Sequence, residues 1–158
     1  MPTNNFNIRV ANWTDDKEDL AGIRRSVFID EQKVPEELEW DEHDLPSIHF
    51  LVTTSEDKPI ASARLKPDGQ IGRMAVLREF RNQGIGQKLL QYVLQHAACQ
   101  KLDRLYLHAQ IDAVPFYEKQ GFNAHGDVFY EANIAHRAML KKPANNTDNS
   151  NENEKMIF

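Results

Sequence analysis

The fold of this chain is decided by the stretch Arg81-Asn82-Gln83-Gly84-Ile85-Gly86, which joins a predicted strand at 71–77 to a predicted long helix that begins near Gly84. The first N–H groups of a helix have no acceptor within the helix, and the helix dipole makes this end positive. A strand-to-helix turn of this kind is therefore a predicted anion site. Its glycines lack a Cβ, which lets a phosphate group come close to the main chain.

Two common phosphate loops do not match these letters. A Walker A loop requires Lys and then Ser or Thr after its last glycine, but Gly86 is followed by Gln87 and Lys88. A dinucleotide fingerprint requires Gly or Ala three residues after its second glycine, and this chain has Leu89 there. ATP, GTP and NAD are therefore disfavoured as ligands, and a nucleotide-binding protein is the weakest function class.

The composition limits the function classes further. A length of 158 residues predicts one domain, and a net charge of −5 disfavours a general nucleic-acid binder, which would carry a basic face. The single cysteine, Cys99, excludes an intramolecular disulfide and a multi-cysteine zinc site, so no metal is expected. No signal-like amino terminus and no apolar run of about 18 residues occur, which predicts a cytoplasmic protein without a membrane partner.

Apolar periodicity and turn residues predict the order of the elements. We expect strands at 7–11, 47–54, 59–66, 70–77, 105–109, 122–130 and 134–141, and helices from an N-cap at Thr14 to before Pro35, from Gly84 to about Gln100, and at 113–120. The strand at 105–109 follows a long crossover helix, so it is expected to pair in parallel with the strand at 71–77.

Two segments lie outside this pattern. Residues 36–44 hold six carboxylates in nine positions and are expected to form a short helix or a loop. Residues 144–158 are rich in Asn, Asp, Ser and Glu, which cannot bury enough apolar surface to become ordered. We therefore expect one domain at 1–143 and a disordered tail.

Three matches connect the sequence to a known family. The loop fits R/Q-x-x-G-x-G/A, residues 113–122 (AVPFYEKQGF) are similar to A-x-x-F/L-Y-E-K-x-G-F, and residues 24–32 followed by Asp41, Asp44 and His49 add a front-half match. Together these resemble the GNAT N-acetyltransferase superfamily, in its ElaA-like or YjcF-like single-domain branch. The resemblance implies an α/β fold with a mixed, mostly antiparallel central sheet, one parallel pair and flanking helices.

The resemblance also implies the ligand. Acetyl-coenzyme A would lie with its pyrophosphate on the loop and its pantetheine along the preceding strand, and an amine would attack the thioester directly. The implied coenzyme-binding residues are Met74, Ala75, Val76, Arg81, Asn82, Gln83, Gly84, Ile85, Gly86, Gln87 and Lys88. Because direct attack needs no enzyme nucleophile, Cys99 is expected to be a small packed thiol inside the long helix. The protein is expected to act as a monomer or a homodimer.

Proton transfer is the chemical task that remains. A lysine-like amine has a pKa of about 10.4 and is neutral in only about one part in a few thousand at pH 7, which contributes roughly 4–5 kcal/mol to the barrier. The resemblance gives Tyr117 the role of general acid toward the coenzyme sulfur. The base stays open among Glu31, Asp41, Asp44, His49 and His108, because the strand at 70–77 carries no carboxylate.

The acceptor side is expected at the acidic segment. Glu31, Asp41, Asp44 and His49 are the predicted acceptor-binding residues, and the carboxylates of 36–44 would attract cationic amines. Arginines 24, 25 and 64 are the alternative partners of these carboxylates. Two function classes then remain: an N-acetyltransferase for a small-molecule or protein amine, or a non-catalytic acyl-coenzyme A sensor with the same fold.

Overall fold

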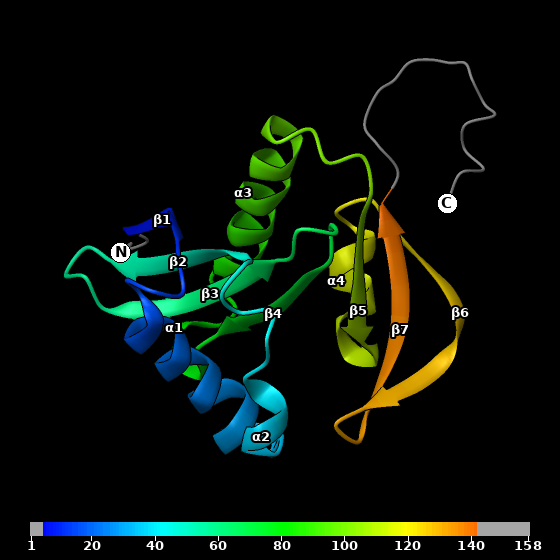
Figure 1. The fold of residues 1–158 in the computed structure, drawn as a ribbon, viewed down its shortest axis with the longest axis horizontal. Helices are drawn as coiled ribbons and strands as arrows, with labels where there is room; N and C mark the ends of the chain where they lie inside the picture. Colours follow the sequence, from blue (N-terminus) through cyan, green and yellow to red (C-terminus); the bar gives the residue numbers. More distant parts are fainter. Residues whose placement is uncertain (1–4, 142–158) are drawn as a thin grey trace.

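The computed structural model describes residues 5–141 (Figure 1). Its strands are β1 (Phe6–Ala11), β2 (Ile48–Thr54), β3 (Pro59–Leu65), β4 (Ile71–Val76), β5 (Leu105–Gln110), β6 (Phe122–Glu131) and β7 (Ile134–Lys141). Its helices are α1 (Lys17–Arg24), a π-helix (Arg25–Glu31), α2 (Glu36–Glu39), α3 (Ile85–Cys99), α4 (Val114–Glu118) and 3₁₀ turns at Arg78–Phe80 and Ile111–Ala113. The predicted element order is confirmed.

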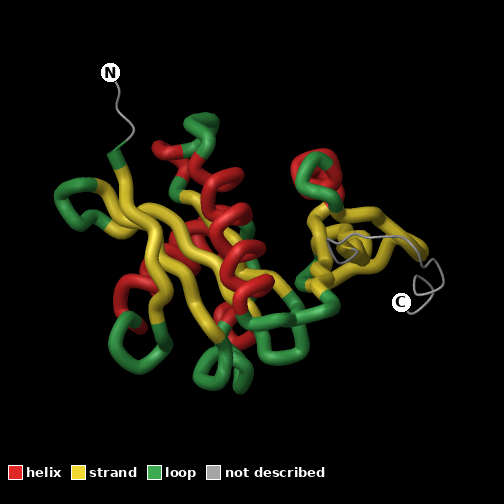
Figure 2. The backbone as a smooth tube through the Cα atoms, turned by 90° about the horizontal axis from the view of Figure 1, so that it is seen from above, coloured by secondary structure: helices red, strands yellow, loops and turns green. Residues whose placement is uncertain are grey.

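The first sheet is an antiparallel meander in the order β1-β2-β3-β4. Side chains alternate across it, so Phe50 and Val52 face the α3 side while Leu51 faces α1. On the α3 side Leu89, Leu90 and their neighbours build the main core, and on the other side Leu20, Ile23 and Val27 build a smaller one. Figure 2 shows the two helical layers on either side of the meander.

Strand β4 carries a bulge at its centre. Ser62 pairs with Ala75 and Arg64 with Gly72, so Arg73 and Met74 together oppose one residue of β3. Arg73 adopts a left-handed backbone conformation with φ 49°, which costs a non-glycine residue roughly 1–2 kcal/mol. The extra residue changes which face the strand presents: Ile71 packs into the main core and Ala75, four residues later, into the smaller one.

The second sheet has the order β5-β7-β6, with α4 packed against β5 and β6. It meets the first sheet through one parallel bridge, Gln70 with Tyr106, where the Tyr106 N–H donates to the Gly69 carbonyl at 3.2 Å. Beyond this bridge β4 and β5 have no further ladder pairs, so the predicted parallel pair is reduced to its first contact. The two strands diverge, and β4 keeps an unpaired edge among the described residues.

Several local expectations need correction. Thr14 does not cap the first helix, which begins at Lys17 after Asp16, because Asn12 accepts from the Asp15 N–H and Asp16 accepts from the Asn12 N–H. The helix also continues as a π-helix from Arg25, and Cys99 is exposed rather than packed, since it lies on the solvent face of the last turn of α3. The predicted tail lies outside the described residues. No helix among the described residues is long and apolar enough to cross a membrane.

Candidate active site

The turn before α3 has the geometry of an anion site. Gly84 is left-handed, with φ 81°, and the helix has no side-chain N-cap. The first hydrogen bond of the helix runs from the Lys88 N–H to the Gly84 carbonyl, so the N–H groups of Ile85, Gly86 and Gln87 point out of the helix end without an intrahelical acceptor. A Cβ on Gly84 would meet no atom within 4 Å, so the space beside Gly84 in this turn is open.

Arg81 and Glu31 hold this turn from the side. Both terminal nitrogens of Arg81 donate to Glu31, at 2.7 and 2.8 Å, and its Nε donates to the Val76 carbonyl at 2.8 Å. The hydrogen bond from Arg81 lowers the pKa of the Glu31 carboxyl, and Arg78 adds to the effect. Glu31 therefore fastens the loop to the π-helix and does not line the cavity in which an acceptor would lie.

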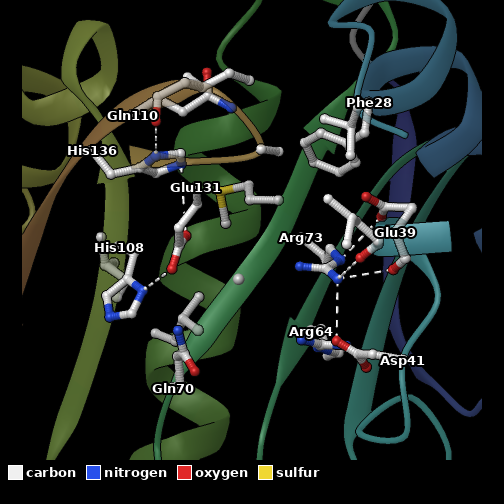
Figure 3. A pocket seen from close by; sticks show the side chains of 18 of the residues that line it. Phe28, Glu39, Asp41, Arg64, Gln70, Arg73, His108, Gln110, Glu131 and His136 are labelled. Atoms are coloured by element: carbon white, nitrogen blue, oxygen red, sulfur yellow. Dashed lines mark hydrogen bonds and ion pairs between the residues drawn. The ribbon is translucent and has the colours of Figure 1, made fainter. Parts of the chain in front are cut away.

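A cavity of about 610 Å³ opens where β4 and β5 diverge (Figure 3). Its apolar lining comes from Phe28, Val34, Leu38, Met74, Leu107 and Ile134. Gln32 and Gln110 exchange amide hydrogen bonds of 3.4 and 2.9 Å and so connect the π-helix to the end of β5. The polar groups on its walls fall into two sets, one on the side of the acidic segment and one on β5 and the β6–β7 hairpin.

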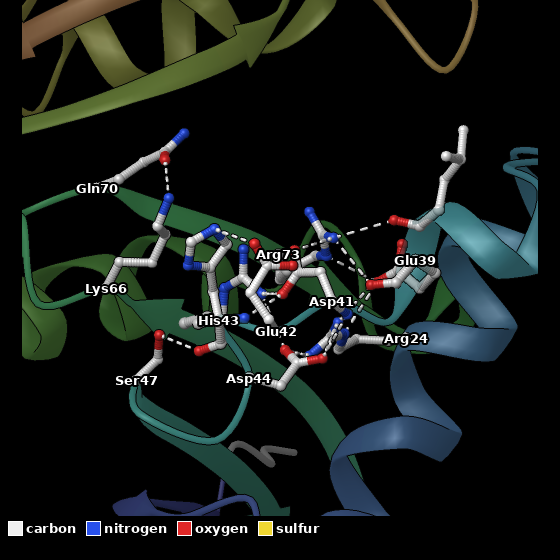
Figure 4. Close-up of polar contacts among 12 residues, drawn as sticks. Arg24, Glu39, Asp41, Glu42, His43, Asp44, Ser47, Lys66, Gln70 and Arg73 are labelled. Atoms are coloured by element: carbon white, nitrogen blue, oxygen red, sulfur yellow. Dashed lines mark hydrogen bonds and ion pairs between the residues drawn. The ribbon is translucent and has the colours of Figure 1, made fainter.

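The first set is a closed ring of six alternating charges (Figure 4). In order around the ring, the side chains are Arg24, Glu39, Arg73, Asp41, Arg64 and Asp44. The guanidinium nitrogen and the carboxylate oxygen of neighbouring members are 2.8–3.1 Å apart. Arg24 also contacts both Trp13 and Trp40, with its guanidinium carbon 5.1 and 5.2 Å from the ring centroids. Three positive and three negative charges leave the ring neutral.

The ring changes the interpretation of the acidic segment. Burial acts to raise the pKa of Asp41 and of Asp44, but arginine hydrogen bonds outweigh it and both pKa values are lowered. Burial raises the pKa of Glu39, so Glu39 is the ring carboxylate that takes up a proton first as the pH falls. Three arginines, Arg24, Arg64 and Arg73, neutralise the ring carboxylates. The ring carboxylates therefore do not form a negative wall that attracts cationic amines. Arginines 24 and 64, the alternative partners, hold them instead.

His49 and Asp44 do not reach the cavity. Asp44 has 3% of its side chain exposed, behind Arg24 and Arg64. His49 is buried, its Nε2 lies 2.7 Å from the Asp44 carbonyl oxygen, and its ring stacks on Trp13. Burial lowers the pKa of His49, which favours the neutral imidazole. Of the predicted acceptor-binding residues, only Asp41 lines the cavity, as a member of the ring.

The second set of polar groups centres on Glu131, which sequence reasoning missed. Its carboxylate accepts a hydrogen bond of 3.0 Å from Nδ1 of His108 and lies 3.9 Å from Nε2 of His136. The His108 hydrogen bond lowers the pKa of Glu131, although partial burial opposes the shift. Glu131 ends β6 and His108 is on β5, so the strand order β5-β7-β6 brings them together. His108, one of the five candidate bases, is thus the one with an exposed carboxylate partner in the cavity.

Tyr117 lines the same cavity from α4. Its hydroxyl lies 3.8 Å from Sδ of Met74, and its ring packs edge-on against Phe116 and Phe122. Burial raises the pKa of Tyr117 to about 12, so the hydroxyl keeps its proton and can donate a hydrogen bond into the gap between β4 and β5. Among the described residues, no group of His, Cys, Asp and Glu has the arrangement of a metal site.

Residues 14–143 match the family model of the acetyltransferase (GNAT) domain. The chain belongs to the GNAT family. It is 34% identical to the uncharacterized N-acetyltransferase YjcF of Bacillus subtilis (strain 168), over 78% of this chain and 91% of YjcF. Among solved structures, an acyl-CoA N-acyltransferase from Pseudomonas aeruginosa superposes with a TM-score of 0.77 at 30% identity, over 86% of this chain and 99% of the other.

Escherichia coli ElaA gives the same TM-score, 0.77, at 26% identity, over 86% of this GNAT chain and 99% of ElaA. The ElaA-like and YjcF-like assignment is therefore confirmed, as is the acyltransferase fold. Membership makes the chain an acyl-coenzyme A-dependent N-acetyltransferase, and the sensor alternative is set aside.

The ion ring yields a stability prediction. Asp44→Asn removes the charge that Arg24 and Arg64 share inside the protein, and breaking a buried pair costs about 3 kcal/mol or more. We expect urea denaturation to show a loss of this size. Glu42→Gln is the matched control, because the Glu42 side chain is 84% exposed on the same segment and should change stability by less than about 0.5 kcal/mol. Equal stabilities in the two variants would contradict a structural role for the ring.

Proposed function

We propose that this GNAT protein transfers the acetyl group of acetyl-coenzyme A to a primary amine by direct attack, in the gap between β4 and β5. The observation that carries the proposal is the single bridge at Gln70, beyond which β4 has an unpaired edge beside a 610 Å³ cavity. Tyr117, His108 and Glu131 all line that cavity, so a hydrogen-bond donor for the leaving sulfur and acceptors for the amine lie in one place.

The residues present fit acetyl-coenzyme A. The outward N–H groups of Ile85, Gly86 and Gln87 suit its pyrophosphate, and Arg81 keeps the loop in position through Glu31. A Cβ at Gly86 would touch Phe116 and Val76 at 3.7 and 3.8 Å, so the loop approaches both α4 and the end of β4. The unpaired edge along Met74, Ala75 and Val76 offers main-chain groups to the pantetheine amides.

The proton balance assigns roles to the cavity side chains. An ammonium loses one proton before it attacks, and its nitrogen loses a second as the C–N bond forms and the C–S bond breaks; one proton balances the leaving thiolate and the other passes to solvent. Glu131 is ionised and accepts a hydrogen bond from the incoming ammonium, and the imidazole of His108 is the neighbouring group that can take the proton onward. Water carries it from there to solvent.

Tyr117 acts on the leaving sulfur. A phenol with a pKa of about 12 holds its proton more tightly than a thiol of pKa about 8.5, so full transfer to the thiolate is uphill by roughly 5 kcal/mol. We therefore assign the hydroxyl the role of a hydrogen-bond donor that stabilises the developing thiolate, which needs no complete proton transfer.

The phosphate loop is tested by Gly84→Val. A β-branched side chain at this left-handed position would project into the open space before the helix and should weaken acetyl-coenzyme A binding at least tenfold, equivalent to about 1.4 kcal/mol, in calorimetry. Gly126→Val is the matched control, because Gly126 has φ 78° and equally open surroundings but lies in β6. Loss of affinity in both variants, or in neither, would remove the loop from coenzyme binding.

The tyrosine is tested by Tyr117→Phe. Because the hydroxyl is needed only as charge develops on sulfur, kcat should fall at least tenfold while the Kd for acetyl-coenzyme A stays within about twofold. Tyr92→Phe removes a hydroxyl from α3, where the described residues offer it no hydrogen bond, and should leave both constants unchanged. Equal turnover in Tyr117→Phe and the parent protein would reduce Tyr117 to a packing residue.

The function itself is tested by the release of free thiol from acetyl-coenzyme A in the presence of primary amines. Glu131→Gln keeps the size of the side chain but removes the carboxylate that holds the ammonium and orients His108, so amine-dependent kcat/KM should fall about a hundredfold. Glu56→Gln, an exposed change in the β2–β3 turn, serves as the control. No amine-dependent release by the parent protein would contradict the proposed function, and full activity in Glu131→Gln would contradict only the role given to Glu131.

A further inference from the structure

Not every charged side chain that lines the cavity belongs to the neutral ring. Glu39, Asp41, Arg64 and Arg73 belong to the neutral ring, which leaves Glu131 as the negative group on one wall and Lys66 as the cavity cation with no carboxylate partner among the described residues. Lys66 donates a hydrogen bond of 3.0 Å to the neutral amide of Gln70. The cavity therefore holds a carboxylate on the wall of the β6–β7 hairpin and an unpaired cation in the turn between β3 and β4.

Arg73, a member of the ring, also offers a hydrogen-bond donor to the cavity. Its Nη2 makes all of its hydrogen bonds, to the carbonyl oxygens of Leu38 and Glu39 and to Asp41, and its Nε lies 3.0 Å from Glu39. Nη1 has no hydrogen bond to any described residue, and Figure 3 shows the guanidinium directed across the cavity toward the wall that carries Glu131. The carboxylates of the ring thus lie behind Arg73, while its unused donor faces the cavity.

Arg73 and Glu131 lie within electrostatic reach of each other. Besides the His108 hydrogen bond, the charge of Arg73 contributes to the lowered pKa of Glu131. Gly72, which has no side chain, lines the cavity on β4 beside Arg73, and a Cβ there would meet nothing within 4 Å. A small molecule can therefore extend over Gly72 between Arg73 and Glu131.

We propose that the acceptor is zwitterionic, an amine that also carries a carboxylate or another small anionic group, with the anion held by Arg73 and Lys66 and the amine at Glu131. The inference rests on the proposed function. A guanidinium edge and an ammonium both donate hydrogen bonds to oxyanions, and charge-assisted bonds of this kind are about twice as strong as neutral ones. Binding the anion at one end also fixes the amine near the group that takes its proton.

The test compares acceptors of matched length. Amino acids of the series from glycine to 6-aminohexanoate, the n-alkylamines of the same length, the corresponding diamines and the aminoalkylphosphonates are assayed for thiol release from acetyl-coenzyme A. We expect kcat/KM for the best anionic amine to exceed that of the alkylamine of the same length at least tenfold. The preferred chain length and anionic group then identify the class of acceptor. Alkylamines or diamines used equally well or better would overturn the zwitterion while leaving the transferase function intact. No acylation of any acceptor would overturn both.

Lys66→Met connects the preference to the cavity without disturbing the ring. It keeps the apolar stem and removes the charge, so the ratio of kcat/KM between the anionic amine and its alkylamine should fall about tenfold, mainly through KM. Lys58→Met, in the turn between β2 and β3, is the control and should leave the ratio unchanged. A ratio that does not move in Lys66→Met, in a protein that binds acetyl-coenzyme A normally, would remove Lys66 from the acceptor site and overturn the proposal.

Discussion

The closed ring of three arginines and three carboxylates is the interaction on which the rest of the structure depends, because it fixes β4 to the acidic segment. Isolated buried ion pairs often contribute little net stability, since desolvation offsets their attraction. In a closed ring each carboxylate lies between two arginines, so no member is left unpaired. Arg73 is the ring member that lies on the bulge, and its contacts with Glu39 and Asp41 hold a backbone conformation that costs energy by itself.

The bulge and the divergence of the sheets explain why a cavity exists at this point. Without a bulge, alternate residues of β4 would face the same core along the whole strand, and β4 could pair with β5 along its length. The bulge shifts the alternation at Arg73 and Met74, and the pairing with β5 stops after Gln70. What remains is an unpaired strand edge between two sheets that share one core, built by α3 with side chains of both sheets. Tyr117 on α4 and Glu131 on β6 reach into the gap that results.

Local signals predicted much of this arrangement. The turn at Gly84, the hairpins and the amphipathic helix from Ile85 are encoded within a few residues of each other, and the structure confirms them. The positions of Asp44 and His49 away from the cavity could not be predicted in this way. Composition shows six carboxylates in the segment, but the folded chain shows that arginines from α1, β3 and β4 neutralise three of them. Glu131 was missed because β7 lies between β5 and β6, and its contact with His108 depends on that strand order.

The central claim is that acyl transfer takes place in the gap that begins at the single bridge between β4 and β5. The measurement that tests it most directly is a crystal structure of the protein with coenzyme A. The account predicts the pyrophosphate at the N–H groups of Ile85 to Gln87, the pantetheine hydrogen-bonded to the free edge of β4, and the sulfur within hydrogen-bond distance of the Tyr117 hydroxyl. A coenzyme bound elsewhere, or one whose sulfur points away from the cavity shared by Tyr117 and Glu131, would contradict it.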